Sequence, residues 1–279
     1  MTTVIRATGV KFNNDDLPTI SPFVTNGLLA AFRPSNSNHG LLDLSGNGHK
    51  LGLVGSPQFT TMSVIGDGKN GLDSSVPETK DFTIITVSRI YRNAWNNFDG
   101  FVATTFLDAD GDDKDRGAGV FYGQLGNQNN NLDVEMTSQV FAKKVSDGTH
   151  HNRYFATKVT EVGKTGNTKD VTPAIFHAFT VDTAKRQMLA YNMSQQKAPV
   201  NFSDELQQGF DAGQRRLVDP YTGQPNRYYV ICNPNYSQWA SKVEVFEVLF
   251  YNRALTQAEI AQQYQYSKDY MEKHHNIDI

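Results

Sequence analysis

The residues with the clearest capacity for chemistry lie in a glycine-rich run, DLSGNGH, at positions 43–49. Asp43 and Asn47 offer a carboxylate and a carboxamide, and Gly46 and Gly48 allow backbone conformations with positive φ. Carboxylate, amide and bare carbonyl oxygens suit hard cations such as Ca²⁺. The same composition is typical of a tight hairpin turn. The run therefore indicates either a calcium or sugar site at the rim of a sheet or a structural turn.

A second acidic run, DADGDD, spans residues 108–113. Asp108, Asp110 and Asp112 have the 1, 3, 5 spacing of an EF-hand loop, which also requires glycine at its sixth position and a bidentate glutamate at its twelfth. Those two positions hold Asp113 and Gly119, so a complete EF-hand is excluded. A partial oxygen cage for Ca²⁺ is one interpretation, although we favour a solvated acidic hairpin tip.

Two tryptophans are candidates for sugar recognition, which commonly combines an aromatic ring stacked on the sugar with polar side chains that bond its hydroxyls. Trp95 lies beside Asn96 in the run RNAWNNFDG. Trp239 follows Tyr236 in the run NYSQWAS. Both runs fall between strand signals, where a tryptophan can stack on a ligand. Loop aromatics also pack beneath their own loop or against a neighbouring subunit, so that alternative stays open.

The composition indicates a folded all-β protein without a general polyanion-binding surface. The chain has 279 residues, of which 38% are hydrophobic and 11% aromatic, so it can form one large domain. Its net charge is −3 with both signs interspersed, and nucleic acid is not an expected partner. The single cysteine, Cys232, excludes an intrachain disulfide, and the histidines lack the spacing of zinc ligands. The start, MTTVIRATGVKF, contains no signal peptide or membrane span.

Short apolar or alternating runs separated by Gly, Asn and Asp recur along the chain, a pattern typical of strands. In DFTIITVSR, Phe82 and Ile84 share one face. Ile85 and Val87 share the other, so both faces of this strand are apolar and we expect both to be covered. The lack of βαβ alternation favours an antiparallel sandwich. The expected strands cover residues 27–32, 81–89, 101–106, 118–125, 131–136, 174–182, 187–192, 227–233 and 242–252.

One helix is predicted near the C-terminus. Thr256 and Glu259 have the spacing of a capping box, in which the threonine oxygen accepts the glutamate N–H and the glutamate carboxylate reaches back. We expect residues 272–279 to form a frayed tail after this short helix. The side chains expected on one face of the helix are Ile260, Tyr264, Ser267 and Met271.

Four stretches, in this order, resemble the concanavalin A-like lectin/glucanase superfamily, and specifically its laminin G-like jelly-roll domains. They are GLLAAFRP with DLSGNGHKLGLVGSPQF, DFTIITVSR, FHAFTVDTAKRQMLAYN and VFEVLFYNRALTQAEIAQQY. In the third stretch Phe176 stands where the family usually has tryptophan, and Met193 where it usually has glycine. The resemblance implies one jelly-roll sandwich over residues 26–271, closed by the helix. It also implies that DLSGNG is a rim loop, which holds calcium in some family members.

The same superfamily includes glycosidases, whose strand motif reads Glu-x-Asp-x-Glu or Glu-x-Asp-x-x-Glu. The nearest stretch is NLDVE, in which Asn131 stands at the nucleophile position and cannot form a glycosyl-enzyme intermediate. Asp133 and Glu135 share one strand face, which is more typical of a solvated surface. Glu244 and Glu247 are expected on opposite faces of their strand. We therefore predict a protein without catalytic residues.

The N-terminal run IRATGVKFNNDDLP resembles leader segments of phage virion proteins, which tie a module to the particle. Pro18 and Pro22 disfavour a helix, so residues 1–25 are expected to form an extended anchoring arm or, alternatively, an edge strand. A chain without an export signal fits a protein that is made in the host cytoplasm and located in the virion.

These observations predict a non-catalytic phage virion component, in a tail, a fibre or a head-appended position, with a lectin-like module for glycan binding or host attachment. The expected partners are other virion proteins through residues 1–25, a host surface glycan and further copies of the chain. Membrane insertion is not expected, and Ca²⁺ is the one cofactor considered. A structural decoration or joining protein without a ligand is the first alternative. A glycoside hydrolase, which Asn131 disfavours, is the second.

Overall fold

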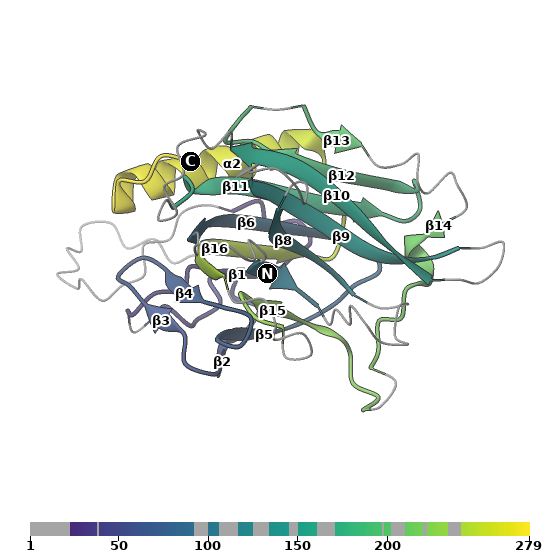
Figure 1. The fold of residues 1–279 in the computed structure, drawn as a ribbon, viewed down its shortest axis with the longest axis horizontal. Helices are drawn as coiled ribbons and strands as arrows, with labels where there is room; N and C mark the ends of the chain where they lie inside the picture. Colours follow the sequence, from purple (N-terminus) through teal and green to yellow (C-terminus); the bar gives the residue numbers. More distant parts are fainter. Residues whose placement is uncertain are drawn as a thin grey trace, which may run out of the picture.

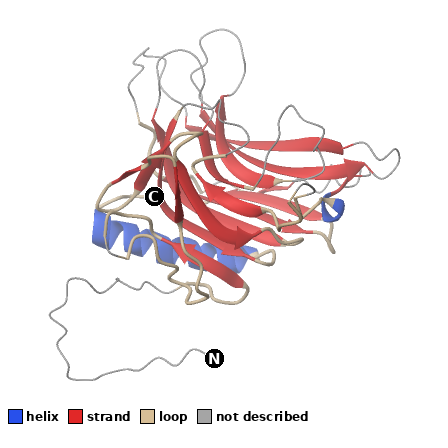
Figure 2. Ribbon diagram, turned by 90° about the horizontal axis from the view of Figure 1, so that it is seen from below, coloured by secondary structure: helices blue, strands red, loops and turns tan. Residues whose placement is uncertain are grey.

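The computed structural model describes residues 23–37, 39–91, 100–105, 117–124, 134–144, 150–160, 171–196, 198–201, 210–219, 222–233 and 241–279. These residues form two antiparallel sheets packed face to face, with a helix against the outer side of one of them (Figures 1 and 2). The predicted all-β antiparallel sandwich with a C-terminal helix is therefore confirmed. Among the described residues, no helix is long and apolar enough to cross a membrane.

We refer to the sheet that carries the helix as the helix-backed sheet. Its strands pair in the order β13 (Val200–Asn201), β12 (Gln187–Asn192), β11 (Ile175–Asp182), β6 (Phe82–Tyr91), β16 (Lys242–Tyr251), β4 (Val64–Gly66) and β3 (Gln58–Phe59). β1 (Leu28–Phe32) also pairs with β16, beyond β4 along the same edge. The long strands β6 and β16 pair along their whole length and form the centre of this sheet.

The second sheet lies opposite. Its strands pair in the order β10 (His150–Thr160), β9 (Val134–Lys144), β8 (Ala118–Gln124), β7 (Gly100–Thr104), β15 (Arg227–Val230), β5 (Gly71–Pro77) and β2 (Gly52–Val54). β14 (Phe210–Asp211) pairs with the end of β9 and leads into a 3₁₀ turn, η1 (Ala212–Gln214). The predicted runs overlap β1, β6–β8, β11, β12, β15 and β16, whereas the run 131–136 reaches only the first residues of β9. The unpredicted strands are short or rich in polar residues, so their alternation is weak.

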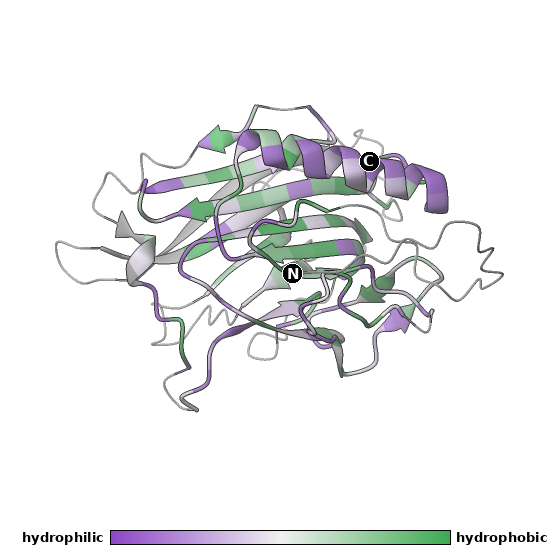
Figure 3. Ribbon diagram, turned by 180° about the vertical axis from the view of Figure 1, so that it is seen from behind, coloured by the Kyte–Doolittle hydropathy of each residue, from purple (hydrophilic) through white to green (hydrophobic). Residues whose placement is uncertain are grey.

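The side-chain alternation of β6 divides the buried residues into two layers. Phe82 and Ile84 face the second sheet, and Ile85 and Val87 face the helix. All four are at most 1% exposed. Figure 3 shows the helix, with polar and apolar residues mixed along its ribbon, lying over the outer side of this sheet. The prediction that both faces of the strand are covered is confirmed.

The helix, α2 (Gln257–His275), begins at the predicted capping box. The N–H of Glu259 donates to Thr256 Oγ1 at 3.3 Å, and the N–H of Thr256 donates to the Glu259 carboxylate at 2.9 Å. Tyr264, predicted on the buried face, is half-buried and packs edge-on against Phe176, with 5.3 Å between ring centroids. The fully buried side chains of the helix are Ile260, Gln263, Ser267 and Met271.

Residues 272–279 do not form the frayed tail that the sequence suggested. The helix continues into this segment and is capped by Asn276, which adopts the left-handed conformation with φ 54°. The N–H of Asn276 bonds the carbonyl of Glu272 at 3.2 Å, as in an αL cap, and the N–H of Ile277 bonds the carbonyl of Met271 at 3.1 Å. Ile279 is 5% exposed and belongs to the apolar cluster beneath the helix. Burial of this terminal isoleucine holds the last residues in place.

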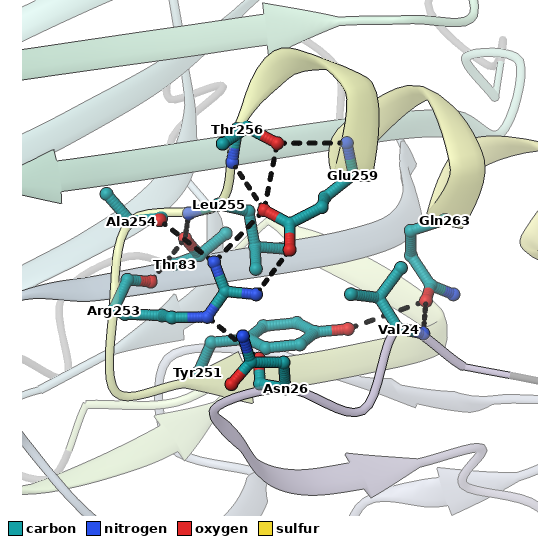
Figure 4. Close-up of polar contacts among 10 residues, drawn as sticks. All are labelled: Val24, Asn26, Thr83, Tyr251, Arg253, Ala254, Leu255, Thr256, Glu259 and Gln263. Atoms are coloured by element: carbon teal, nitrogen blue, oxygen red, sulfur yellow. Dashed lines mark hydrogen bonds and ion pairs between the residues drawn. The ribbon is translucent and has the colours of Figure 1, made fainter.

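The turn between β16 and α2 ties three parts of the chain together (Figure 4). Arg253 Nε donates to the carbonyl of Asn26 at 2.9 Å, and the terminal nitrogens of Arg253 bond the Glu259 carboxylate at 2.5 and 3.0 Å. Thr83 of β6 donates to the carbonyl of Arg253 at 2.8 Å and accepts the N–H of Leu255 at 2.9 Å. The bond from Arg253 is the main reason that the pKa of Glu259 is lowered to about 2.

Residues 1–22, most of the predicted arm, lie outside the described residues. The described chain starts at Phe23 beside the helix. The N–H of Val24 donates to Gln263 Oε1 at 2.9 Å, and the hydroxyl of Tyr251 lies 3.4 Å from the same oxygen (Figure 4). Val24 therefore belongs to the sandwich, and α2 holds the chain at this point.

Candidate functional site

The glycine-rich run at 43–49 forms a turn whose carboxylate is engaged by the chain itself. Asp43 Oδ1 accepts the N–H groups of Ala31 at 3.0 Å and Ser45 at 2.9 Å. Asp43 Oδ2 accepts the hydroxyl of Ser45 at 2.8 Å and the N–H of His49 at 3.3 Å. N–H and O–H donors of the protein thus bond both oxygens of the Asp43 carboxylate, which would otherwise be the ligands of a cation.

Asn47 fastens this turn to β1. Its side-chain nitrogen donates to the carbonyls of Leu28 at 2.8 Å and Leu29 at 3.0 Å. Gly46 and Gly48 have φ of 82° and 86°, the left-handed conformation that these glycines were expected to permit. Within the described residues, no three His, Cys, Asp or Glu side chains are grouped to hold a metal ion. This geometry supports the structural alternative, and calcium binding stays a prediction.

The other candidate residues lie outside the described part of the chain. The structure describes the residues that flank these segments. For the two tryptophan-bearing segments, 92–99 and 234–240, both residues that flank the first lie close to the residue that follows the second. The candidates in question are Trp95 and Asn96, Asp108, Asp110 and Asp112, Asn131, and Tyr236 and Trp239.

The ends of the two tryptophan-bearing segments meet at one corner of the sandwich. The first segment follows Tyr91, the last residue of β6, and precedes Gly100, the first residue of β7. The second segment precedes Ser241, and the next residue, Lys242, is the Cα partner of Tyr91. A Cβ placed on Gly100 would lie 3.6 Å from the carbonyl oxygen of Ser241. We call this region the β6–β16 corner.

A buried carboxylate organises the β6–β16 corner. The side chain of Glu244 is 1% exposed. Its Oε1 accepts the hydroxyl of Ser63 at 2.5 Å. Its Oε2 accepts Arg89 Nε at 2.6 Å and the hydroxyl of Tyr91 at 2.5 Å. These four residues form the Glu244 network, whose short, charge-assisted bonds fix the positions of the arginine and the tyrosine.

The Glu244 network has an accessible side. The Arg89 side chain is 29% exposed, and its guanidinium lies 5.2 Å from the ring centroid of Phe246. Burial and the hydrogen bond to Glu244 raise the pKa of the Tyr91 phenol above its ordinary value, so it is protonated at neutral pH. A fixed guanidinium and a neutral phenol can bond the hydroxyl or carbonyl oxygens of a ligand. One engaged carboxylate does not provide the flanking pair that glycoside hydrolysis requires.

Glu244 and Glu247 lie on the same face of β16, so the prediction of opposite faces was wrong. The register against β6 shifts between Val245 and Glu247, which places a β-bulge at Phe246 and reverses the alternation. Glu247 consequently points toward α2 and pairs with Arg33 at 2.7 Å. Each of the two carboxylates forms an ion pair with a different arginine.

Arg89 and Tyr91 were not among the residues singled out from the sequence. One signal was available, because Arg89 shares its strand face with the apolar Ile85 and Val87, and a charged residue on a buried face needs a partner. That partner, Glu244, lies 155 positions further along the chain. No local pattern identifies a pairing over such a distance.

No family model matches the sequence, and no curated protein matches it either. Several solved structures share the fold. The receptor-binding domain of botulinum neurotoxin D matches 89% of this chain, with 10% identity and a TM-score of 0.50. The receptor-binding domain of the botulinum neurotoxin C/D mosaic serotype matches 88%, with 9% identity and a TM-score of 0.50. A Trypanosoma rangeli sialidase mutant displaying trans-sialidase activity matches 88%, with 14% identity and a TM-score of 0.50.

These similarities concern the fold. The chain spans 54% and 52% of the two toxin domains and 33% of the sialidase. At such low identity they show a shared β-sandwich and assign no residue of this chain a role.

Proposed function

We propose that this chain is a non-catalytic, lectin-like module that binds a glycan at the β6–β16 corner. The observation that carries the proposal is that both tryptophan-bearing segments join the sandwich beside the Glu244 network. Trp95 and Trp239 supply rings that stack on a sugar, while Arg89 and Tyr91 bond its hydroxyls. Asn131 at the nucleophile position is the sequence feature that argues against hydrolysis.

The charge balance of the corner favours a neutral sugar. Glu244 neutralises Arg89, so the network has no net charge with which to attract a carboxylated sugar. Arg89 is 29% exposed and can donate further N–H groups. The Tyr91 hydroxyl donates to Glu244 and accepts an Arg89 N–H at 3.5 Å, and its second lone pair can accept a bond from a ligand. This pairing of donors and an acceptor is complementary to vicinal hydroxyl groups.

The wider role that we propose is attachment of a phage particle to its host. The similar toxin domains are named as receptor-binding domains, which supports an attachment function for a sandwich of this kind. The resemblance of the N-terminal run to virion leader segments supports a location in the phage particle. In this role residues 1–25 bind other virion proteins in a tail, fibre or head-appended position. Several copies on one particle would raise the avidity for a surface glycan.

A glycan array probed with the full chain tests this proposal. We expect binding to neutral glycans, and about a tenfold loss of affinity, equivalent to ~1.4 kcal/mol, for Trp95→Ala and for Trp239→Ala. Leu53→Ala is the matched control, because Leu53 is 61% exposed on the edge strand β2 and should not affect binding. Absence of glycan binding by the wild-type chain would contradict the proposal. So would tryptophan variants that both bind with the affinity of the wild type.

The structural alternative is a decoration or joining protein without a ligand, in which the N-terminal arm joins the other virion proteins. Deletion of residues 1–22 leaves the bond from Val24 to Gln263 in place, so we expect the sandwich to fold. Loss of incorporation into particles, together with an empty glycan array, would support the structural alternative. Normal incorporation of the deletion variant would rule out anchoring by this segment.

A further inference from the structure

A row of polar side chains crosses the inner face of the helix-backed sheet, in the middle of the apolar core. Asn192, His177 and Thr86 are successive Cα partners in β12, β11 and β6. All three are at most 1% exposed. Ser138 of β9 meets the row from the second sheet, with its Oγ 3.4 Å from His177 Nε2. The surrounding inner-face positions carry mostly Phe, Tyr, Ile, Val, Met and Ala, together with Ser88, whose hydroxyl lies 3.0 Å from the Tyr122 hydroxyl.

Two atoms of this row have no hydrogen-bond partner among the residues that the structure describes, His177 Nδ1 and Thr86 Oγ1. An unpaired buried polar atom costs about 1–3 kcal/mol, and the great majority of such atoms in folded proteins are paired. Residues directly opposite on antiparallel strands have Cβ atoms about 4.5–5.5 Å apart. A single small molecule between the sheets can therefore reach both atoms.

Water has the chemistry that fits both atoms. Burial lowers the pKa of His177 to about 3, so its ring is neutral at physiological pH, and Nδ1 is a donor in one tautomer and an acceptor in the other. The Thr86 hydroxyl also takes either role. Water offers donors and acceptors together and satisfies every combination. A metal ion does not fit, because the described side chains around the row include no further histidine, cysteine or carboxylate.

We propose that an ordered water molecule is bound at the inner face by His177 Nδ1 and Thr86 Oγ1, while Ser138 Oγ meets the other ring nitrogen, Nε2. This water links β11 to β6 inside the core. A one-residue slip between the two strands would turn one of its partners to the opposite face, so the bound water also favours the native register.

A high-resolution crystal structure of the full chain is the direct test. We expect a water peak at about 2.7–3.2 Å from both His177 Nδ1 and Thr86 Oγ1. Direct bonds from both atoms to other protein atoms, or an empty space between them, would overturn the proposal.

The variant Thr86→Val tests for the same water through the sign of the change in melting temperature. If the hydroxyl holds a water, the variant loses that bond, so we expect a lower melting temperature and no water peak. If the hydroxyl is unpaired, its removal raises the melting temperature, which would overturn the proposal. Thr180→Val is the matched control, because Thr180 is buried on the other face of β11 and its hydroxyl bonds the Leu189 carbonyl at 3.4 Å. Its melting temperature should also fall.

Should Thr86→Val fail to fold, the wild-type chain still decides the question. Nuclear magnetic resonance of the ¹⁵N-labelled imidazole of His177 should show magnetisation transfer between the ring and a long-lived water. A buried imidazole without any such transfer would count against the bound water.

Discussion

The pair of Arg33 and Glu247 on the helix side of the helix-backed sheet and the polar row on its inner side both bury polar groups, but the two clusters differ in kind. On the helix side the groups are charged: Arg33 and Glu247 pair at 2.7 Å, and Ser267 of α2 donates to the same carboxylate. In the inner-side row of Asn192, His177 and Thr86 the groups are neutral, and His177 Nδ1 and Thr86 Oγ1 have no hydrogen-bond partner among the described residues. The same layer also meets a buried ion pair, because the Arg215 guanidinium, paired with Glu78, lies 5.2 Å from the ring centroid of Phe82.

Apart from the ion pair with Glu247, the terminal nitrogens of Arg33 also have no hydrogen-bond partner among the described residues, and aromatic rings cover the guanidinium. Arg33 lies between the rings of Phe23 and Tyr270, at 4.7 and 3.5 Å from their centroids, so the helix and the incoming chain surround the charge. Three elements can converge there because a helix packs on a sheet. Between two sheets, strand side chains converge from two directions only, and a small neutral ligand can complete the hydrogen bonds that the strands leave open.

The largest effect is expected on the charged side. Replacement Arg33→Met leaves Glu247 buried and unpaired, and should lower the free energy of unfolding by about 3–5 kcal/mol. Urea unfolding followed by circular dichroism measures the loss. The double variant Arg33→Met with Glu247→Leu removes both charges and should recover most of the stability. A loss below about 1 kcal/mol in the single variant would show that the pair is not buried as described.

The inner side should respond to acid. The folded-state pKa of His177 is lowered to about 3 from an ordinary value of 6.5 by burial. Its neutral form therefore contributes stability that is complete above about pH 6.5 and is lost as the pH falls toward 3, at up to about 1.4 kcal/mol per pH unit.

Denaturant unfolding of the wild type and of His177→Gln between about pH 4 and 7 checks this prediction. The variant should show the smaller loss of stability on acidification, since it has no imidazole to protonate. His274→Gln is the control, because His274 lies on the exposed side of α2 and its removal should leave most of the slope in place. Parallel pH curves for wild type and His177→Gln would contradict the assignment.

The smallest effect tests the cap on which the charged side depends. Thr256→Ala removes the side-chain oxygen that accepts the N–H of Glu259, and should lower the free energy of unfolding by about 1 kcal/mol. Thr256→Ser keeps the oxygen and should lie close to the wild type. Equal stabilities of all three proteins in urea would show that packing of the helix, and not its cap, determines where it begins.

The sequence was most informative where the interactions are local. Thr256 and Glu259 lie three positions apart and form the capping box that was predicted. The alternation of β6 placed Phe82 and Ile85 in different layers, as the structure confirms. The turn at Asp43 was also identified, because residues that permit left-handed backbone conformations cluster there.

Local patterns failed where distant residues set the geometry. The bulge at Phe246 reverses the alternation of β16, so Glu247 turns toward the helix and not toward the second sheet. Ile279 packs beneath α2, which holds a segment that its polar neighbours marked as a tail. The Glu244 network joins Ser63 to Glu244 over 181 positions of sequence.

The sequence by itself therefore determined the apolar strands, the capped helix and the all-β class, because hydrophobic alternation and capping act between near neighbours along the chain. Only the tertiary structure decided which charges share a layer, which carboxylate each arginine meets, and that the ends of both tryptophan-bearing segments meet at one corner. These features depend on strand pairing between residues far apart in the sequence. A single bulge changes them, and the local hydrophobic alternation of the sequence does not reveal it.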